Sequence, residues 1–153
     1  MSKKDQLDLD QFELLESIGS GAYGSVQKIR NKKNEKLYAA KILKAKSNEI
    51  DDQDKSFKRE LRCHQTLDNP AVIKFIGYSM TDFDGNKYPV FITKYMEKGC
   101  LRGVLDLVRK KKPPKGWNNT KMIINILGIS LGMKYLHDNG IIHRDLKPSN
   151  ILL

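Results

Sequence analysis

The residues best suited to chemistry stand together near the end of the sequence, in the run His143-Arg144-Asp145-Leu146-Lys147-Pro148-Ser149-Asn150. The run contains a carboxylate at Asp145, an amine at Lys147 and a side-chain amide at Asn150. Groups that act on one reacting centre must be held in fixed positions, and a short rigid loop can do this. An isolated tract of this composition could also be a solvated helix end or turn, so its interpretation depends on the rest of the chain.

A second chemically informative run is Gly19-Ser20-Gly21-Ala22-Tyr23-Gly24-Ser25-Val26. The pattern G-x-G-x-x-G also marks dinucleotide-binding units, but there it opens a helix and an acidic residue follows about twenty positions later. Here a charged turn at residues 31–36 and a strand-like run at residues 37–43 follow, which predicts that the glycines lie between strands. Glycine lets a backbone close over phosphate groups without side-chain clash. A plain glycine-rich hairpin is the alternative.

The strand-like run that follows the glycines carries a lysine, Lys41. Strand alternation alone does not decide whether this side chain faces water or a partner. A helix is predicted from Asp54 to Leu67, because its apolar residues recur at helical spacing, and Glu60 shares their face. An unpaired carboxylate there is costly, so Lys41 is the candidate partner of Glu60. The alternative places Glu60 on a solvated flank with its charged neighbours, Arg59 and Arg62.

With these motifs in this order, the chain resembles the protein kinase family from about Phe12 to Leu153, and the residues after Asp145 resemble the serine/threonine branch. The resemblance implies ATP-dependent phosphorylation of protein hydroxyls, with ATP and Mg²⁺ as cofactors, and a role in signal transduction. It implies that Asp145 accepts the hydroxyl proton, Lys147 neutralises phosphate charge and Asn150 binds Mg²⁺. Lys41, fixed by Glu60, would reach the α- and β-phosphates.

The same resemblance assigns positions that would contact the nucleotide. Ala39 would leave room above adenine, Thr93 would be the gatekeeper, and Lys94 and Met96 would offer backbone groups in a hinge, residues 91–99. The remaining positions belong to the glycine-rich segment: Ile18, Gly19, Ser20, Gly21, Ala22, Tyr23, Gly24 and Val26. Without the resemblance, residues 91–99 could also be an edge strand followed by a glycine turn.

Composition limits the other classes of function. The 153 residues are 39% apolar, which is enough to bury a core. Cys63 and Cys100 offer neither metal-ligand spacing nor a disulfide framework, and no apolar signal region opens the chain. We therefore expect a cytoplasmic or nuclear setting. The longest uncharged apolar stretch, residues 122–133, is shorter than the roughly twenty residues that cross a bilayer, so no membrane span is expected.

The net charge is +10, and its densest cluster is Arg109-Lys110-Lys111-Lys112-Pro113-Pro114-Lys115. Such a cluster could bind polyanions or direct nuclear localisation. Five charges on a segment broken by prolines are more often a solvated loop, and no aromatic residues are interleaved for base stacking. Nucleic acid is therefore a disfavoured partner.

The expected fold is α+β and protein-kinase-like: a five-stranded antiparallel N-lobe with one helix, plus an incomplete helical C-lobe. Residues 1–11 are predicted to be a polar lead-in, residues 12–95 the N-lobe, residues 96–99 the end of the hinge and residues 100–153 a partial C-lobe. Two strand-like runs, 72–78 and 88–95, flank a loop whose Asp82-Phe83-Asp84-Gly85 is expected to be a turn rather than a metal-binding motif.

The predicted helix at residues 120–139 is apolar on two opposite sides, so protein is expected on both. No Asp-Phe-Gly, activation loop or Ala-Pro-Glu follows Leu153, so the domain is expected to be truncated after the catalytic loop. Terminal residues are also poorly held unless they are docked. The alternatives to an active kinase are a non-catalytic nucleotide-binding or regulatory module that docks a partner on its open lower face, and a polyanion-binding protein. The substrate protein is not predicted.

Overall fold

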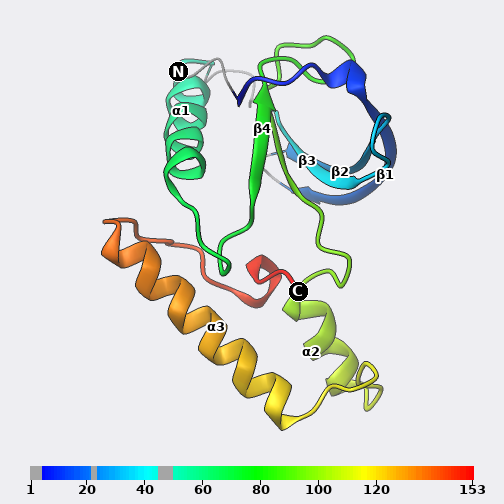
Figure 1. Ribbon diagram of the computed structural model, residues 1–153, viewed down its shortest axis with the longest axis vertical. Helices are drawn as coiled ribbons and strands as arrows, with labels where there is room; N and C mark the ends of the chain where they lie inside the picture. Colours follow the sequence, from blue (N-terminus) through cyan, green and yellow to red (C-terminus); the bar gives the residue numbers. More distant parts are fainter. Residues whose placement is uncertain (1–4, 22–23, 45–49) are drawn as a thin grey trace. The chain divides into compact units, whose positions relative to one another are not determined.

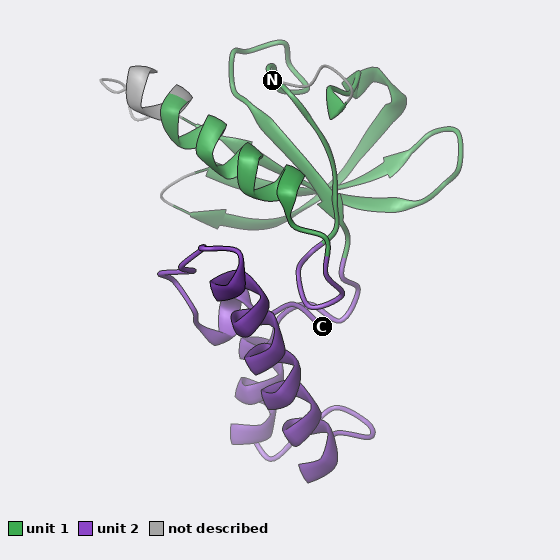
Figure 2. Cartoon of the chain, turned by 60° about the vertical axis from the view of Figure 1, so that its left-hand side comes forward, with its two compact units in different colours: residues 1–68, 74–95 green, residues 69–73, 96–153 purple. Residues whose placement is uncertain are grey.

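The computed structural model describes residues 5–21, 24–44 and 50–153, without the side chains of residues 50–54. The chain forms two compact units, coloured separately in Figure 2. The first contains Met1–Asp68 and Lys74–Tyr95, and the second contains Asn69–Ile73 and Met96–Leu153.

The first unit is built on a five-stranded antiparallel sheet in the order β1-β2-β3-β5-β4 (Figure 1). Its strands are β1 (Phe12–Gly21), β2 (Gly24–Asn31), β3 (Leu37–Leu43), β4 (Phe75–Ser79) and β5 (Val90–Lys94). The sequence prediction of a five-stranded antiparallel N-lobe sheet is confirmed, and among the described residues of this unit α1 is the one α-helix, as expected.

Alternation along β3 gives the sheet two different faces. Ala40 and Ile42 are buried in one core cluster, whose other buried members are Leu9, Phe12, Ile29, Val90 and Ile92. The next residue, Leu43, joins a second cluster with Phe57, Leu61, Tyr78 and Phe91. Because neighbouring strand residues point to opposite faces, Lys41 lies on the same face of β3 as Leu43.

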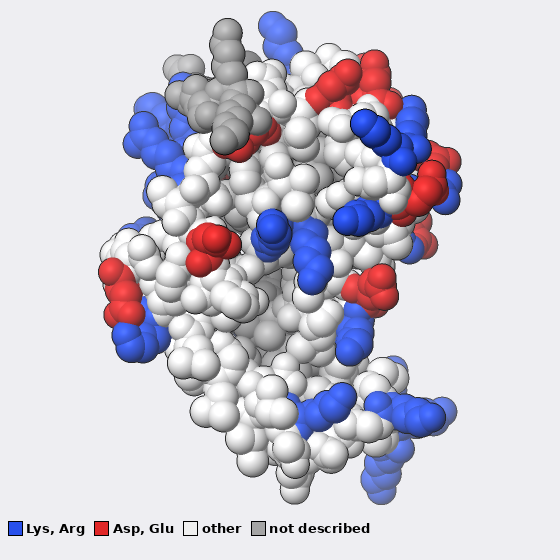
Figure 3. All heavy atoms as spheres, viewed as in Figure 1, with Lys and Arg blue, Asp and Glu red and all other residues white. Residues whose placement is uncertain are grey.

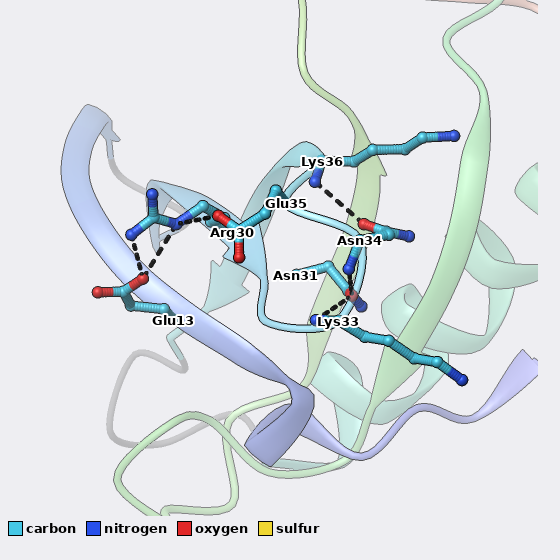
Figure 4. Close-up of polar contacts among 7 residues, drawn as sticks. All are labelled: Glu13, Arg30, Asn31, Lys33, Asn34, Glu35 and Lys36. Atoms are coloured by element: carbon cyan, nitrogen blue, oxygen red, sulfur yellow. Dashed lines mark hydrogen bonds and ion pairs between the residues drawn. The ribbon is translucent and has the colours of Figure 1, made fainter.

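The turn between β2 and β3 is fixed by side-chain amides rather than by glycine (Figure 4). The Oδ1 atom of the buried Asn31 accepts the backbone N–H groups of Lys33 (3.0 Å) and Asn34 (3.1 Å). Arg30 adds an ion pair across to Glu13 on β1, at 2.6 Å. Asparagine side chains favour turns by replacing backbone hydrogen bonds in this way, so the strand pair that carries Lys41 has a well-defined register.

The helix of this unit, α1 (Ile50–Thr66), lies against the second cluster. Phe57 stacks on Phe91 of β5 with ring centroids 4.8 Å apart, and Leu61 is buried one turn later. Residues four apart share one helix face, so the same face must carry Glu60 near the sheet. The helix ends one residue before the predicted end and begins four residues before the predicted start.

The segment before β1 is attached to the sheet. Gln6 forms a parallel bridge with Tyr78, and the Leu7 N–H donates to the Tyr78 carbonyl at 2.8 Å. Asp5 accepts a hydrogen bond from Gln65 of α1 at 2.6 Å, and the 3₁₀ turn η2 (Leu9–Gln11) buries Leu9. The part of the expected polar lead-in that the structure describes thus extends the β4 edge.

The connection between β4 and β5 is a turn organised by Asp82, as expected for a hairpin connection. Its carboxylate accepts the backbone N–H groups of Asp84 (3.0 Å) and Asn86 (2.8 Å) and the side-chain amide of Asn86 (3.0 Å). Asp82 is therefore engaged in holding the turn, and its resemblance to a metal-binding motif is superficial.

The second unit contains the helices α2 (Leu101–Arg109) and α3 (Asn119–Asp138) and the 3₁₀ turn η3 (Pro148–Asn150). Asn118 caps α3 by accepting the Lys121 N–H at 2.9 Å, and Gly140 ends it with a φ of 71°. Large apolar residues of α3 remain exposed: Met122, Ile123, Ile124, Ile126, Leu127 and Leu131. Among the described residues no helix is both long and apolar enough to cross a membrane.

The last residues of the chain are docked within this unit. Leu101 N–H donates to the Ile151 carbonyl at 2.8 Å, and Leu153 N–H donates to the Gly99 carbonyl at 2.9 Å. These bonds flank an antiparallel bridge between Cys100 and Leu152. The short segment after η3 is therefore held against the start of α2, which fixes one end of the loop that contains Asp145.

Candidate active site

The glycine-rich segment forms the hairpin between β1 and β2. Gly21 pairs with Gly24, and Gly19 pairs with Val26. Gly24 has a φ of 135°, and a Cβ atom there would lie 1.9 Å from the Ile42 carbonyl oxygen. No other residue could take this position without displacing β3, so the start of β2 lies closely against the backbone of β3. Of the other predicted residues, Ile18 and Ser20 are exposed on β1, and Ala22 and Tyr23 lie outside the described residues.

Lys41 and Glu60 form the ion pair that the sequence predicted. Lys41 pairs in register with Val26 of β2 and with Phe91 of β5. Its Nζ lies 2.5 Å from Oε1 of Glu60 on α1, and both side chains are partly exposed. The alternatives, an outward-facing lysine and a solvated glutamate flank, do not describe this geometry.

The electrostatics of this pair favour the charged forms. Burial by itself raises the pKa of Glu60, but the neighbouring His64 imidazole and the Lys41 ammonium outweigh it, so the net pKa lies below the ordinary value. The His64 Nε2 atom stands 3.9 Å from the same Oε1 atom. A carboxylate that stays ionised can fix the lysine ammonium in one place over the face of the sheet.

The predicted adenine-contacting positions lie beside this pair on the same sheet. Ala39 of β3 is directly opposite Thr93 of β5. The Lys94 N–H is already used, because it donates to the Lys74 carbonyl at 2.9 Å. In the second unit the Met96 carbonyl accepts the Gly99 N–H at 3.2 Å and so closes a turn. The Met96 N–H takes no part in that hydrogen bond.

The Asp145 loop is organised by its own side chains. Lys147 Nζ lies 2.9 Å from Oδ2 of Asp145. The amide nitrogen of Asn150 donates both to this Oδ2 atom (2.9 Å) and to the Asp145 carbonyl (2.8 Å). Hydrogen bonds from Lys147 and then Asn150 hold the pKa of Asp145 below its ordinary value. The three predicted residues of the second unit are thus brought together, although all three are exposed.

Two further features of this loop bear on its chemistry. Arg144 has a φ of 61°, which is unusual for a residue other than glycine, and strain of this kind is typical of functional loops. Because the Asn150 nitrogen faces Asp145, its Oδ1 atom takes no part in those two bonds. An amide oxygen is a hard donor that suits Mg²⁺.

Across the described residues, no group of three His, Cys, Asp or Glu side chains could hold a metal ion.

Sequence reasoning missed the surroundings of Glu60. The sequence analysis gave no role to His64, although its i, i+4 spacing from Glu60 was a usable signal. The bridge between Gln6 and Tyr78 was also missed, because it joins segments about seventy residues apart and leaves no local pattern.

Comparison with known proteins agrees with this fold and arrangement of residues. The family model described as "Protein kinase domain" matches residues 12–153 of the chain. The chain belongs to the protein kinase family, whose domain in general uses ATP and a divalent metal.

Its relatives include serine/threonine kinases of several organisms. Human receptor-interacting serine/threonine-protein kinase 3 is 32% identical over 96% of this chain, and 3-phosphoinositide-dependent protein kinase B of Dictyostelium discoideum is 34% identical over 99%. A MAP kinase kinase of Schizosaccharomyces pombe is 33% identical over 91%. The chain spans 26%, 15% and 37% of the length of these three relatives, respectively.

Proposed function

We propose that this chain provides the ATP-binding and phosphoryl-transfer residues of a protein serine/threonine kinase that uses Mg²⁺. The Lys41–Glu60 ion pair is the observation that carries the proposal. It joins a lysine on β3 to a glutamate on α1, and both follow the glycine hairpin in the sequence. A surface ion pair of no function would not need that setting.

On the nucleotide side, the hairpin backbone around Gly21 would cover the phosphates, and Lys41 would bind their α- and β-oxygens. Glu60 would keep the ammonium in position, so that little ordering remains to be done when ATP arrives. Ala39 and Thr93, opposite each other in register, would form part of the adenine wall. The small Thr93 side chain would leave space behind the base.

On the acceptor side, Asp145 would take the proton of a Ser or Thr hydroxyl as that oxygen attacks the γ-phosphate. The low pKa of Asp145 favours the ionised form that such a role requires. Lys147 would neutralise charge on the phosphate that moves. The Asn150 amide oxygen would hold Mg²⁺, which supplies charge neutralisation on the phosphate oxygens when bound.

The first test is calorimetric titration of the chain with ATP, with and without Mg²⁺, alongside Lys41→Met. We expect micromolar binding in the unchanged chain and a loss of roughly 10- to 100-fold in the variant, the size of a charge-assisted contact. Lys36→Met, which removes an exposed lysine of the β2–β3 turn, is the matched control (Figure 4). Equal affinity in all three proteins would remove Lys41 from the nucleotide site.

The second test concerns transfer itself. Where phosphorylation of a generic protein substrate is measurable, Lys41→Met should slow it by roughly 10²- to 10³-fold. Asp145→Asn should suppress turnover while leaving ATP affinity nearly unchanged, because Asp145 acts on the acceptor side. If Asp145→Asn weakened ATP binding as much as turnover, its role would be structural. Nucleotide binding with no transfer under any condition would favour a regulatory nucleotide-binding module.

A further inference from the structure

The carboxylate of Glu60 has two basic neighbours, and the assigned roles account for only one of them. Its Oε1 atom contacts Lys41 Nζ at 2.5 Å and His64 Nε2 at 3.9 Å. Lys41 comes from β3, whereas His64 lies one helical turn after Glu60 on α1 itself. The His64 side chain is only 19% exposed, so this histidine is not a solvent-facing residue that happens to pass nearby.

The imidazole ring is held in a fixed plane. It stacks on Phe75 of β4 with centroids 5.1 Å apart and an interplanar angle of 16°. It also contacts Phe91 of β5, with ring centroids 5.3 Å apart and an interplanar angle of 51°. Two strands therefore determine where Nε2 points, and it points toward the Glu60 carboxylate. A ring needed only to fill space would not require a nitrogen at this edge.

We propose that His64 is a positioning residue that holds the Glu60 carboxylate in place for Lys41. The effect of His64 on the kinase reaction rests on the proposed function of Lys41. The contact between His64 and Glu60 does not depend on that function. At 3.9 Å the two groups interact electrostatically without a direct hydrogen bond, and a small rotation of the carboxylate brings them within hydrogen-bonding distance. Without such a hold, a long glutamate side chain on a helix surface has several rotamers available.

The charge balance at Glu60 supports this geometry. Burial acts to raise the pKa of this carboxyl, and His64 and Lys41 act together to reverse that effect. His64 thus contributes to the lowered pKa of Glu60 at the edge of an aromatic cluster. In a purely structural role His64 would contribute its ring contacts with Phe75 and Phe91 and nothing to the Glu60 charge.

Two substitutions separate these roles. His64→Phe keeps an aromatic ring against Phe75 but removes the nitrogen, whereas His64→Gln keeps an N–H donor but removes the ring. His137→Phe is the matched control, because His137 is an exposed histidine at the end of α3. The readout is the pKa of Glu60, followed by the ¹³C shift of its side-chain carboxyl in protein labelled on glutamate, with the thermal unfolding midpoint measured for each variant.

We expect His64→Phe to raise the pKa of Glu60 with little change in the unfolding midpoint. His64→Gln should lower the midpoint but keep the pKa of Glu60 closer to that of the unchanged chain. His137→Phe should change neither. An unaltered Glu60 pKa in His64→Phe would overturn the proposal, and so would an equal rise of this pKa in both His64 variants.

ATP titration of the same proteins separates this inference from the proposed function. If both hold, His64→Phe weakens Mg-ATP binding by about 3- to 10-fold, the size of one hydrogen bond, and less than Lys41→Met does. If the unchanged chain binds no ATP, the proposed function fails, while a rise of the Glu60 pKa in His64→Phe would still establish the hold on Glu60. If ATP binds and depends on Lys41 but not on His64, the positioning role fails alone.

Discussion

The Asp145 loop shows how individual residues prepare a catalytic group before any ligand arrives. Lys147 and Asn150 both donate to Oδ2 of Asp145, and Lys147 makes the larger contribution to the lowered pKa of that carboxyl. We therefore expect Lys147→Met to raise the pKa of Asp145 toward its ordinary value, measured by the ¹³C shift of the Asp145 carboxyl. Lys134→Met is the matched control, because Lys134 pairs with Asp138 instead. A lowered or unmoved Asp145 pKa in Lys147→Met would contradict the assignment.

The same linkage gives the pH dependence of the loop. A carboxyl whose folded-state pKa is lowered contributes order above its ordinary pKa, and that contribution is lost as the pH falls through the folded value. The Asn150 bonds to Asp145 should therefore persist at neutral pH and weaken only in acid. Because Asp145 is fully solvated, this affects the loop conformation and not the global stability.

A second carboxylate, Asp82, is buried and stabilises a turn, whereas Asp145 is exposed and assigned to catalysis. It is 7% exposed and accepts bonds from Asp84 and Asn86. Burial acts to raise its pKa, but the Asn86 and Asp84 bonds and the charge of Lys44 outweigh that effect, so the net pKa is lowered. We expect Asp82→Ala to cost about 1–3 kcal/mol of unfolding free energy in urea, because the turn loses the three part-buried hydrogen bonds that the carboxylate accepts.

The control for this prediction is Asp84→Ala, which removes an exposed carboxyl from the same turn and should change the unfolding free energy little. The stability advantage of the unchanged chain over Asp82→Ala should be complete above the ordinary pKa of Asp82 and should shrink as the pH falls through the lowered value. An advantage that grew in acid would refute the role of the ionised carboxylate.

At the scale of elements, β4 accepts the N-terminal segment because one residue lacks a side chain. A Cβ atom on Gly77 would lie 2.6 Å from the Asp5 carbonyl oxygen and 2.6 Å from the Leu7 side chain. The Asp5 carbonyl stands two residues before Leu7, whose N–H bonds to the Tyr78 carbonyl, so displacing Asp5 strains that bond. Gly77→Ala should therefore cost about 1–3 kcal/mol of unfolding free energy and speed hydrogen exchange at the Leu7 amide.

Gly103→Ala provides the comparison, since no atom lies within 4 Å of its added Cβ in α2. Alanine should be neutral there or stabilise the helix by roughly 0.5–1 kcal/mol. If Gly77→Ala were as harmless as Gly103→Ala, with Leu7 exchange unchanged, the N-terminal segment would not be seated on β4 in solution.

The elements also show what the sequence could and could not predict. Alternation and helical spacing predicted β3, α1 and α3, and the face of α1 predicted the Lys41–Glu60 pair. The ends of strands were predicted less well: the expected strand from Val72 begins at Phe75, because Val72 N–H bonds to the Asn69 carbonyl in a turn. The i, i+4 spacing of His64 from Glu60 could be read from the sequence, but the orientation of the His64 ring could not, because it depends on Phe75 and Phe91, which lie on other elements.

At the scale of the whole molecule, two properties act against each other. A net charge of +10 makes copies of the chain repel one another. The exposed face of α3, whose Leu131 is 65% exposed, favours their association. Figure 3 shows uncharged atoms over the middle of the position that α3 occupies in Figure 1, with charged side chains toward its upper end. The balance should depend on salt, because the Debye length falls from about 10 Å at 0.1 M to about 3 Å at 1 M ionic strength.

We therefore expect the chain to sediment as a monomer at low salt and to associate as salt rises, since screening removes the repulsion and leaves the apolar attraction. Substituting Ile124→Lys and Leu131→Lys together should keep the protein monomeric at high salt, measured by sedimentation velocity. The matched control, Leu14→Lys with Leu15→Lys, adds the same two charges at exposed positions of β1. If that control suppressed association equally, net charge alone would govern it. If neither pair did, the α3 face would not be the surface through which copies meet.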